Sequence, residues 1–460
     1  MDPIRVFNRY VSQRHLTVFA GELLLISGSM AFVLHRYSPN DDLSTAVWKG
    51  SVVSGLCLLC LYYNDLYDLT VVRTSREVFI RLLQSVGSAL ILIALLYLAI
   101  PWLIVADGAS LPAFALFMSG ILAWRLVFHQ LVRLHSFGER ILIVGTDPTA
   151  RTIARQILAQ QDFAYEIVGY IDEDPSRASE LVANGRVVGT PADIEALVAR
   201  HHVDRLVVGM SDRRGRLPVR ELLRAKLRGV RVEDVNTMYE RLTGKLLVED
   251  LRPSWLIFSD DFRASRMTRQ SKRVFDVLIA LVGLVLAAPF VALTALAIWL
   301  ESGRPILYRQ ERVGQNGRVF TLNKFRSMRQ DAEQGTPIWA SAADDRVTRV
   351  GQIIRQTRLD EIPQLWNVLR GDMSFVGPRP ERPFFVAQLA EQIPFYEQRH
   401  AVKPGITGWA QVKYRYGASL EDSLEKLRYD LYYVKHLSLP FDITILFDTV
   451  KVVLFAKGAR

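Results

Sequence analysis

The chain has 460 residues, of which 50% are hydrophobic and 23% charged, and 57 Lys and Arg against 47 Asp and Glu give a net charge of +10. This composition excludes an intrinsically disordered chain, and a mean hydropathy of +0.14 points to a membrane protein rather than an ordinary soluble enzyme. With only two cysteines, a disulfide scaffold and a four-cysteine zinc or iron–sulfur site are excluded.

Four apolar stretches occur within the first 135 residues: Leu16–Leu34, Trp48–Tyr63, Phe79–Ile100 and Phe114–Leu134. Because about 20 apolar residues span a bilayer, we predict a four-helix transmembrane bundle over residues 1–136. Arginines are concentrated before the first stretch, between the second and third, and after the fourth. The positive-inside rule therefore predicts a multi-pass protein of the inner (cytoplasmic) membrane, with everything after residue 135 on the cytoplasmic face.

Residues 137–240 alternate between short apolar strands and helices. We expect strands at Ile141–Gly145 and Tyr165–Asp172 with a helix at Pro148–Gln160 between them, a rhythm that predicts a small doubly wound Rossmann-like domain. Asp147 stands where a dinucleotide site needs a second glycine, and its carboxylate would repel a phosphate. We therefore favour a structural, dimerising or regulatory role for this domain over nucleotide binding. Residues 241–268 are expected to be a linker.

Residues 277–300 carry no charge and are long enough to span a membrane. Pro289 interrupts this run near its middle, where a proline removes a helical hydrogen bond and bends the helix. Basic residues lie on both sides of the run, whereas a spanning helix favours an asymmetric distribution. We therefore predict a re-entrant membrane helix that enters one leaflet, kinks at Pro289 and returns, with an ordinary span as the alternative.

Three clusters of charged residues lie in the basic C-terminal region, residues 269–460. Lys324–Met328 follows a short predicted strand, Arg355–Trp366 places Asp360 and Glu361 beside two arginines, and Gly377–Pro380 is a rigid turn that presents one guanidinium. Adjacent carboxylates on a helix point about 100° apart, so they can divide labour rather than share a proton. One can attack phosphorus while the other holds Mg²⁺, and arginines neutralise the phosphate oxygens. The alternative is an acidic pair that merely favours the helix dipole.

These clusters, together with Lys403–Val412, resemble the bacterial sugar transferases, which are monotopic polyprenyl-phosphate phosphoglycosyl transferases. The similarity runs from Ser271 to the C-terminus. The preceding helices and Rossmann-like domain resemble the long form of this family, and Glu421–Tyr433 is similar to its exopolysaccharide-type members. The resemblance implies a re-entrant helix followed by an α-rich (α+β) catalytic domain. Where many members have serine before the kink proline, this chain has Ala288.

The resemblance also implies a two-step reaction at Asp360. This carboxylate would attack the β-phosphate of a UDP-sugar, release UMP and form an aspartyl-phosphosugar, which undecaprenyl phosphate would then accept. Glu361 would hold Mg²⁺. Phosphate-binding roles are implied for Lys324, Arg326, Arg355, Arg358 and Arg379. A nucleotide pocket is expected at Gly405, Thr407, Gly408 and Asp430, with a tight turn as the alternative for the first three.

The expected partners are a UDP-sugar, undecaprenyl phosphate and membrane lipids, and a homodimer is compatible with this interpretation. Nucleic acid is not expected, because the basic region contains no recognition motif. The expected outcome is the start of exopolysaccharide- or O-antigen-type glycan assembly at a bacterial inner membrane. Since the chemistry uses only the C-terminal region, a protein truncated before Thr268 is expected to stay active. Two alternatives are a membrane-bound nucleotide-sugar dehydratase or epimerase, and a non-catalytic scaffold for polysaccharide assembly.

Overall fold

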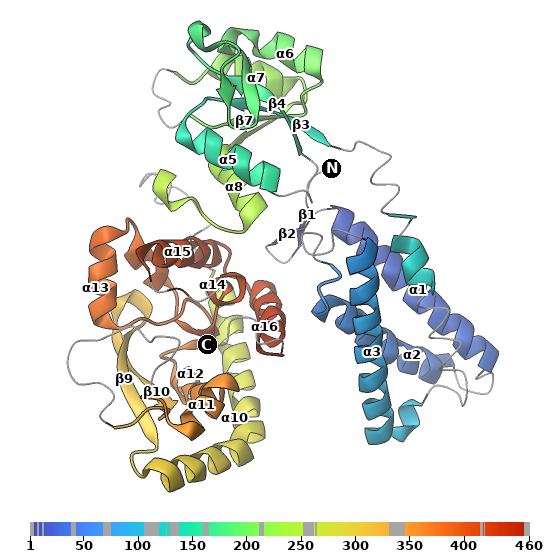
Figure 1. Cartoon of the computed structure of the whole chain (residues 1–460), viewed down its shortest axis with the longest axis vertical. Coiled ribbons are helices and arrows are strands. Elements are labelled where there is room, and N and C mark those ends of the chain that lie inside the picture. Colours follow the sequence, from blue (N-terminus) through green and yellow to red (C-terminus); the bar gives the residue numbers. More distant parts are fainter. Residues whose placement is uncertain are drawn as a thin grey trace. The chain divides into compact units, whose positions relative to one another are not determined.

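The computed structural model describes residues 4–6, 9–11, 13–37, 43–67, 75–104, 119–125, 127–128, 138–159, 165–210, 216–251, 262, 265–330, 346–414, 417 and 419–454. The chain divides into two compact units (Figure 1), one formed by Met1–Arg5 and Tyr10–Val235 and the other by Val6–Arg9 and Asn236–Arg460. A two-stranded sheet of β1 (Ile4–Val6) and β2 (Arg9–Val11) lies at the N-terminus.

The first unit begins with three long helices, α1 (Gln13–Tyr37), α2 (Leu43–Tyr63) and α3 (Ser75–Ala99), followed by the short η1 (Pro101–Leu103). The helices pack through a cluster of buried apolar residues that also includes Ile121, from a helical segment at 119–125. Arg125 of that segment forms a buried ion pair with Glu22 of α1 (2.7 Å). The rest of the predicted fourth helix, Phe114–Leu134, lies almost wholly outside the described residues.

Two of the described helices are long and apolar enough to cross a membrane: Glu77–Ala99, within α3, and α10 (Arg266–Ser302). The apolar parts of α1 and α2 are shorter, at Leu16–Ser29 and Val47–Tyr63. The predicted apolar helices of the first 100 residues are therefore present, whereas a complete four-helix bundle stays a prediction.

A six-stranded sheet in the order β5-β6-β4-β3-β7-β8 confirms the predicted Rossmann-like fold. Its strands are β3 (Glu139–Val144), β4 (Tyr165–Ile171), β5 (Leu181–Val182), β6 (Gly185–Gly189), β7 (Arg205–Val208) and β8 (Arg231–Asp234), all parallel except the β5–β6 pair. Connecting helices are α5 (Pro148–Ala159), α6 (Ile194–His201), α7 (Val219–Leu227), η3 (Pro175–Arg177) and η4 (Pro191–Asp193). Successive residues of β3 are buried on both faces of the sheet, as is typical of a parallel sheet that is covered on both sides.

The second unit is rich in helices and contains two small sheets. Its helices are α8 (Val235–Thr243), η5 (Val248–Asp250), α10, η7 (Gln315–Gly317), α11 (Arg349–Gln356), η8 (Leu359–Glu361), α12 (Gln364–Arg370), α13 (Pro383–Gln392), η9 (Tyr396–Ala401), α14 (Trp409–Lys413), α15 (Leu420–Lys435) and α16 (Leu439–Leu454). Strands β9 (Leu307–Val313) and β10 (Val319–Phe325) form an antiparallel hairpin, and β11 (Ser374–Val376) pairs in parallel with β12 (Gly405–Thr407). The core gathers around Trp409, Tyr432 and Phe441.

Helix α10 is bent, and both of its ends are attached to the same domain. Figure 1 shows the helix turning sharply between its first and last parts, and Pro289 lies inside it. Near the first end, Arg273 donates to the carbonyls of Val368 and Leu369 at the end of α12 (2.6 and 2.7 Å). Near the second end, Glu301 accepts from the backbone N–H of Arg349 at the start of α11 (2.9 Å). Between these ends most large apolar side chains are exposed, including Val285 and Leu286.

The segment that follows β8 packs on α15 of the second unit. Glu240 of α8 accepts hydrogen bonds from Lys435 (2.7 Å) and from His436. Downstream of α8, Leu246, Val248 and Leu251 are buried in the core of this unit. The described part of the expected linker, up to Leu251, therefore contributes to a hydrophobic core.

Candidate active site

Asp360 and Glu361 lie in a tight turn between two helices. After α11 ends, Arg358 adopts a left-handed backbone conformation (φ 61°), and the single 3₁₀ turn η8 carries both carboxylates. Pro363 caps the start of α12, where its fixed φ suits entry into a helix and its missing N–H leaves no donor unpaired. The two acidic residues thus precede α12.

Glu361 is held by two cations. Its Oε1 accepts hydrogen bonds from Lys324 Nζ of β10 (3.0 Å) and from Arg379 Nη2 (3.1 Å). Burial by itself would raise the pKa of Glu361, but Lys324 and Arg379, with a further contribution from Arg358, hold this pKa well below its ordinary value. Glu361 therefore stays ionised throughout the physiological pH range.

The pKa of the neighbouring Asp360 is shifted in the opposite direction, above its ordinary value. It is 8% exposed. Burial raises the pKa of Asp360 and the charge of Glu361 raises it further, which outweighs the lowering effect of Lys324, Arg379 and Arg355. Two adjacent carboxylates thus differ in their protonation behaviour, a pattern that marks candidate catalytic groups when it occurs in a cationic site.

Four of the five predicted phosphate-binding residues surround this turn. Lys324 and Arg379 contact Glu361 directly, and the charge of Arg358 acts on the same carboxylate. Arg355 acts on Asp360 and donates from Nε to Ser327 Oγ (2.9 Å), which orients its guanidinium. These four cations come from β10, from α11 and the residues just after it, and from the loop after β11, so they can bind several oxygens of one phosphate or diphosphate group.

Arg326, the fifth predicted phosphate-binding residue, has a different position. Its Nη2 donates to the carbonyls of Ser302 (2.8 Å) and Gly303 (2.9 Å) and to the Ser302 hydroxyl (2.6 Å). The side chain is buried and satisfies backbone oxygens at the end of α10, which no further helical turn can satisfy. In this structure Arg326 thus caps α10, and none of its described hydrogen bonds reaches the Asp360–Glu361 turn.

Gly405, Thr407 and Gly408 occupy a close backbone contact. A Cβ on Gly405 would lie 2.1 Å from the backbone nitrogen of Gly377, and one on Gly408 would lie 2.2 Å from the carbonyl oxygen of Gly377. Thr407 is buried, and its hydroxyl hydrogen bonds with that of Thr449 (2.7 Å). Gly405 and Gly408 therefore pack β12 and the residue after it closely against Gly377, in the loop that carries Arg379. Gly405 and Thr407 lie in a strand that pairs with β11, and the nucleotide pocket stays a prediction.

Asp430, also predicted for the nucleotide pocket, is 1% exposed on α15 and forms an ion pair with Arg399 (2.8 Å). Burial raises the pKa of Asp430, although Arg399 opposes this shift. Arg399 also donates to the carbonyl oxygen of Arg379 (3.0 Å). Sequence reasoning did not single out Arg399, because its partners lie 20 and 31 positions away and no local pattern connects them.

Asp360 and Glu361 could bind a divalent metal only together with oxygen ligands that a substrate supplies. No group of three or more His, Cys, Asp and Glu side chains gathers into a metal site among the described residues. Mg²⁺, however, commonly uses one or two carboxylates together with substrate phosphates and water. The donor set of Asp360 and Glu361 fits that mode of binding.

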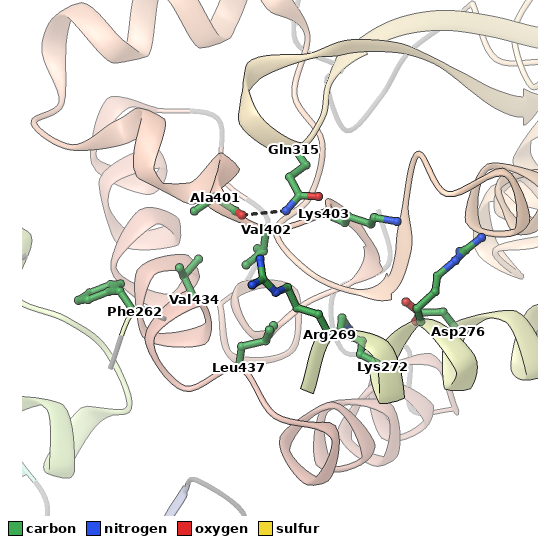
Figure 2. A pocket seen from close by; sticks show the side chains of 11 residues that line it. Phe262, Arg269, Lys272, Asp276, Gln315, Ala401, Val402, Lys403, Val434 and Leu437 are labelled. Carbon is green, nitrogen blue, oxygen red and sulfur yellow. Dashed lines mark hydrogen bonds between the residues drawn. The ribbon is translucent and has the colours of Figure 1, made fainter. Parts of the chain in front are cut away.

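A separate cavity of about 230 Å³ opens beside the start of α10 (Figure 2), and none of the residues of the Asp360–Glu361 site lines it. Its basic lining residues include Lys272 and Arg273, which are engaged elsewhere. Lys272 donates to the carbonyl of Val376 (3.0 Å) and pairs with Asp442, and Arg273 caps α12. These two cations therefore contribute to packing around α10.

Comparison with known proteins relates both parts of the chain to described families. Residues 267–456 match the model described as bacterial sugar transferase, and residues 62–223 match a CoA-binding domain. The chain is 43% identical over 241 residues to a UDP-N-acetylgalactosamine-undecaprenyl-phosphate N-acetylgalactosaminephosphotransferase of Aeromonas hydrophila (52% of this chain, 56% of that protein). It is 33% identical over 342 residues to an undecaprenyl-phosphate glucose phosphotransferase of Komagataeibacter xylinus (72% of this chain, 62% of that protein).

The match to a third relative covers a larger share of that protein's length. The chain is 34% identical over 329 residues to the UDP-glucose:undecaprenyl-phosphate glucose-1-phosphate transferase of Escherichia coli, with 69% of this chain and 68% of that protein aligned. The matches to the Aeromonas and Komagataeibacter proteins, by contrast, cover less than two thirds of those proteins. Together with the family model over the acidic turn and its cations, these similarities show that the chain belongs to the bacterial sugar transferase family.

Proposed function

We propose that the protein transfers a sugar-1-phosphate from a UDP-sugar to undecaprenyl phosphate and releases UMP. The observation that carries this proposal is the pair of adjacent carboxylates with opposite pKa shifts, held among Lys324, Arg355 and Arg379. The activities of these relatives support the same reaction class. A dehydratase or epimerase, or a non-catalytic scaffold, has no corresponding support in the site or in these relatives.

In the first step, a carboxylate oxygen of Asp360 attacks the β-phosphorus of the UDP-sugar. A new O–P bond forms, and the bond between the β-phosphorus and the bridging oxygen breaks, so that UMP leaves with that oxygen and its electron pair. Lys324, Arg355 and Arg379 offset the repulsion between a carboxylate and a phosphate, and stabilise the charge on the leaving group. The product is an aspartyl-phosphosugar.

In the second step, a phosphate oxygen of undecaprenyl phosphate attacks the same phosphorus. The bond to Asp360 breaks, which regenerates the carboxylate and gives undecaprenyl-diphosphate sugar. Burial of Asp360 favours the first step, in which it attacks, because a poorly solvated carboxylate is a better nucleophile than one surrounded by water.

We also propose that Glu361 would hold Mg²⁺ when the UDP-sugar is bound. When bound, the metal supplies positive charge to the diphosphate oxygens. Glu361 suits this role because its low pKa keeps it ionised, while Lys324 and Arg379 fix the orientation of its carboxylate.

The proposal includes a re-entrant α10 in a bacterial inner membrane. The contacts of Arg273 near one end of α10 and of Glu301 near the other reach one domain, which a straight span would separate by a bilayer. Exposed apolar side chains between these ends suit contact with lipid. We infer that the catalytic domain lies on the cytoplasmic face of a multi-pass protein, with the undecaprenyl phosphate headgroup near Asp360, and that the product enters exopolysaccharide-type assembly.

A homodimer that forms through the Rossmann-like domain completes the proposal. Its test is the mass of the purified protein in nanodiscs, where a single-chain particle would contradict it.

Intact-protein mass spectrometry tests the reaction. The full chain is incubated with Mg²⁺ and a panel of UDP-sugars, without the lipid acceptor. We expect a mass gain of one phosphosugar that is absent in Asp360→Asn and is discharged by undecaprenyl phosphate. UMP release without any adduct would remove Asp360 from the role of nucleophile, and no UMP release with any donor and acceptor would contradict the proposed activity.

A further inference from the structure

The loop that carries Arg379 is held at successive backbone carbonyls. The carbonyl oxygens beside Arg379 each accept a hydrogen bond from a different part of the domain: Pro378 from Gly405 N (3.0 Å), Pro380 from Arg312 Nη1 (3.0 Å) and Glu381 from Val313 N (2.9 Å). The carbonyl of Arg379 itself accepts from Arg399 Nη2 (3.0 Å). The main chain of this residue is therefore fixed, while its guanidinium reaches Glu361 (3.1 Å).

Arg399 is buried, and its guanidinium contacts several protein groups. It is 4% exposed, its Nε donates to Asp430 Oδ2 (3.0 Å), and its Nη1 donates to Tyr396 Oη (2.9 Å). Its Nη2 is shared between the Asp430 carboxylate (2.8 Å) and the carbonyl of Arg379. Four of the five N–H donors of a guanidinium are accounted for by these contacts.

We propose that Arg399 and Asp430 are positioning residues that hold Arg379 in place on Glu361 without touching the substrate. Asp430 fixes the plane of the Arg399 guanidinium through two contacts, and Arg399 fixes the backbone of Arg379. Both residues are buried, and the contacts described for their side chains are all with protein groups. The carboxylate of α15 thus acts on the reaction through a relay of two arginines.

Asp430→Asn tests this relay, because it preserves the shape of the side chain but removes its charge. Loss of a group that orients a functional side chain commonly reduces activity by about 10- to 100-fold. We expect a loss of that size in UMP release by the full-length protein in nanodiscs, with Mg²⁺, undecaprenyl phosphate and the UDP-sugar that forms the adduct. In an Arg379→Gln background the same substitution is expected to cost less than about twofold, because the residue that it positions is already gone.

Glu240→Gln is the matched control. Glu240 is also a buried carboxylate bonded to α15, but its partners are Lys435 and His436 rather than Arg399. It is expected to lower thermal stability by an amount similar to Asp430→Asn, with an effect on UMP release that is the same in both backgrounds. Equal losses for Asp430→Asn in both backgrounds would overturn the relay. If Asp430→Asn does not fold, Arg399→Lys takes its place in the same cycle.

The kinetic readout rests on the proposed function, so a second measurement is independent of it. Hydrogen exchange in a peptide covering residues 374–382 should be faster in Asp430→Asn than in Glu240→Gln. Unchanged exchange in this peptide, in a folded protein, would overturn the positioning role whatever the substrate. Absence of UMP release from the unmodified protein would instead count against the proposed function alone.

Discussion

Asp360 and Glu361 are adjacent in the chain, but their pKa values are shifted in opposite directions. Glu361 faces Lys324 and Arg379 at hydrogen-bonding distance, whereas Asp360 is buried beside the negative charge of Glu361. The difference suits the two carboxylates to separate roles in the proposed reaction, Glu361 as a permanent anion and Asp360 as a poorly solvated nucleophile.

The raised pKa of Asp360 predicts the pH dependence of adduct formation. The carboxylate must be ionised to attack, so the rate is expected to fall as the pH drops through a pKa above the ordinary carboxyl value. Lys324→Gln removes the largest influence that lowers this pKa, and should move the acid limb to higher pH as well as reduce the rate. Rapid-quench mass spectrometry at a series of pH values measures the rate of adduct formation and the pH at which it falls. An acid limb that does not move in Lys324→Gln would contradict this assignment.

Arg326 lies within a motif of the family, and its described hydrogen bonds are to the end of α10. We predict that its role is structural. Arg326→Gln removes a charged donor from the end of α10, which is expected to cost about 1.5–3 kcal/mol of unfolding free energy. UMP release should stay within about threefold of the unmodified value. The matched variant is Arg355→Gln, which replaces the arginine whose charge acts on Asp360. It should lower UMP release and change the free energy of unfolding little. Denaturant unfolding with activity assays compares the two; normal stability with weak donor binding in Arg326→Gln would restore a phosphate-binding role.

At the scale of secondary-structure elements, the length and shape of α10 bear on where the Asp360–Glu361 turn lies relative to a membrane. As a straight helix of 37 residues α10 would be about 55 Å long, well beyond the thickness of a bilayer core. The helix is bent, contains Pro289 and is attached to one domain at both ends. In the proposed arrangement its apolar middle part would enter the membrane, and the Asp360–Glu361 turn would stay at the surface.

A re-entrant α10 predicts that residues before and after it are reached from one side of the membrane. Met267→Cys and Arg309→Cys, each made after replacement of Cys57 and Cys60, should both react with an impermeant maleimide from the cytoplasmic side alone. Both parent side chains are exposed in the structure. Labelling of inside-out and right-side-out vesicles separates the outcomes. Reaction of Arg309→Cys only from the opposite side would show that α10 spans the membrane.

At the scale of the whole molecule, the second unit begins before the family's catalytic region. Leu246 and Val248 are each 1% exposed in a core shared with Trp409. Lys245 also pairs with Glu425 of α15. From this packing we predict that the segment from Val235 to Leu251 is part of the folded C-terminal domain.

Two truncated proteins test that boundary. Residues 235–460 should remain folded and release UMP, because they keep α8 and the segment that follows it. Residues 265–460 lose buried apolar side chains that include Leu246, Val248 and Leu251 of this core, and each such loss is expected to cost about 1.5–3 kcal/mol. Thermal unfolding in detergent compares them. Equal stability and activity of the two would show that the segment is dispensable, as the sequence suggests.

The sequence by itself determined the features that depend on local pattern. The alternation of strands and helices predicted the Rossmann-like sheet, the uncharged run with Pro289 predicted a bent apolar helix, and the motifs around Asp360 and Glu361 identified the family. These features could be predicted because periodicity, apolar length and motif spacing are each contained within a short stretch of chain.

Only the tertiary structure decided what the individual side chains of the site contact. Arg326 and Arg355 are indistinguishable as basic residues in a motif, yet one caps α10 and the other lies beside Asp360. The role of Arg399 and the opposite pKa shifts of the two carboxylates were likewise not predictable from sequence. Burial and charge pairing depend on partners brought together from distant positions, and a local pattern contains no information about those distances.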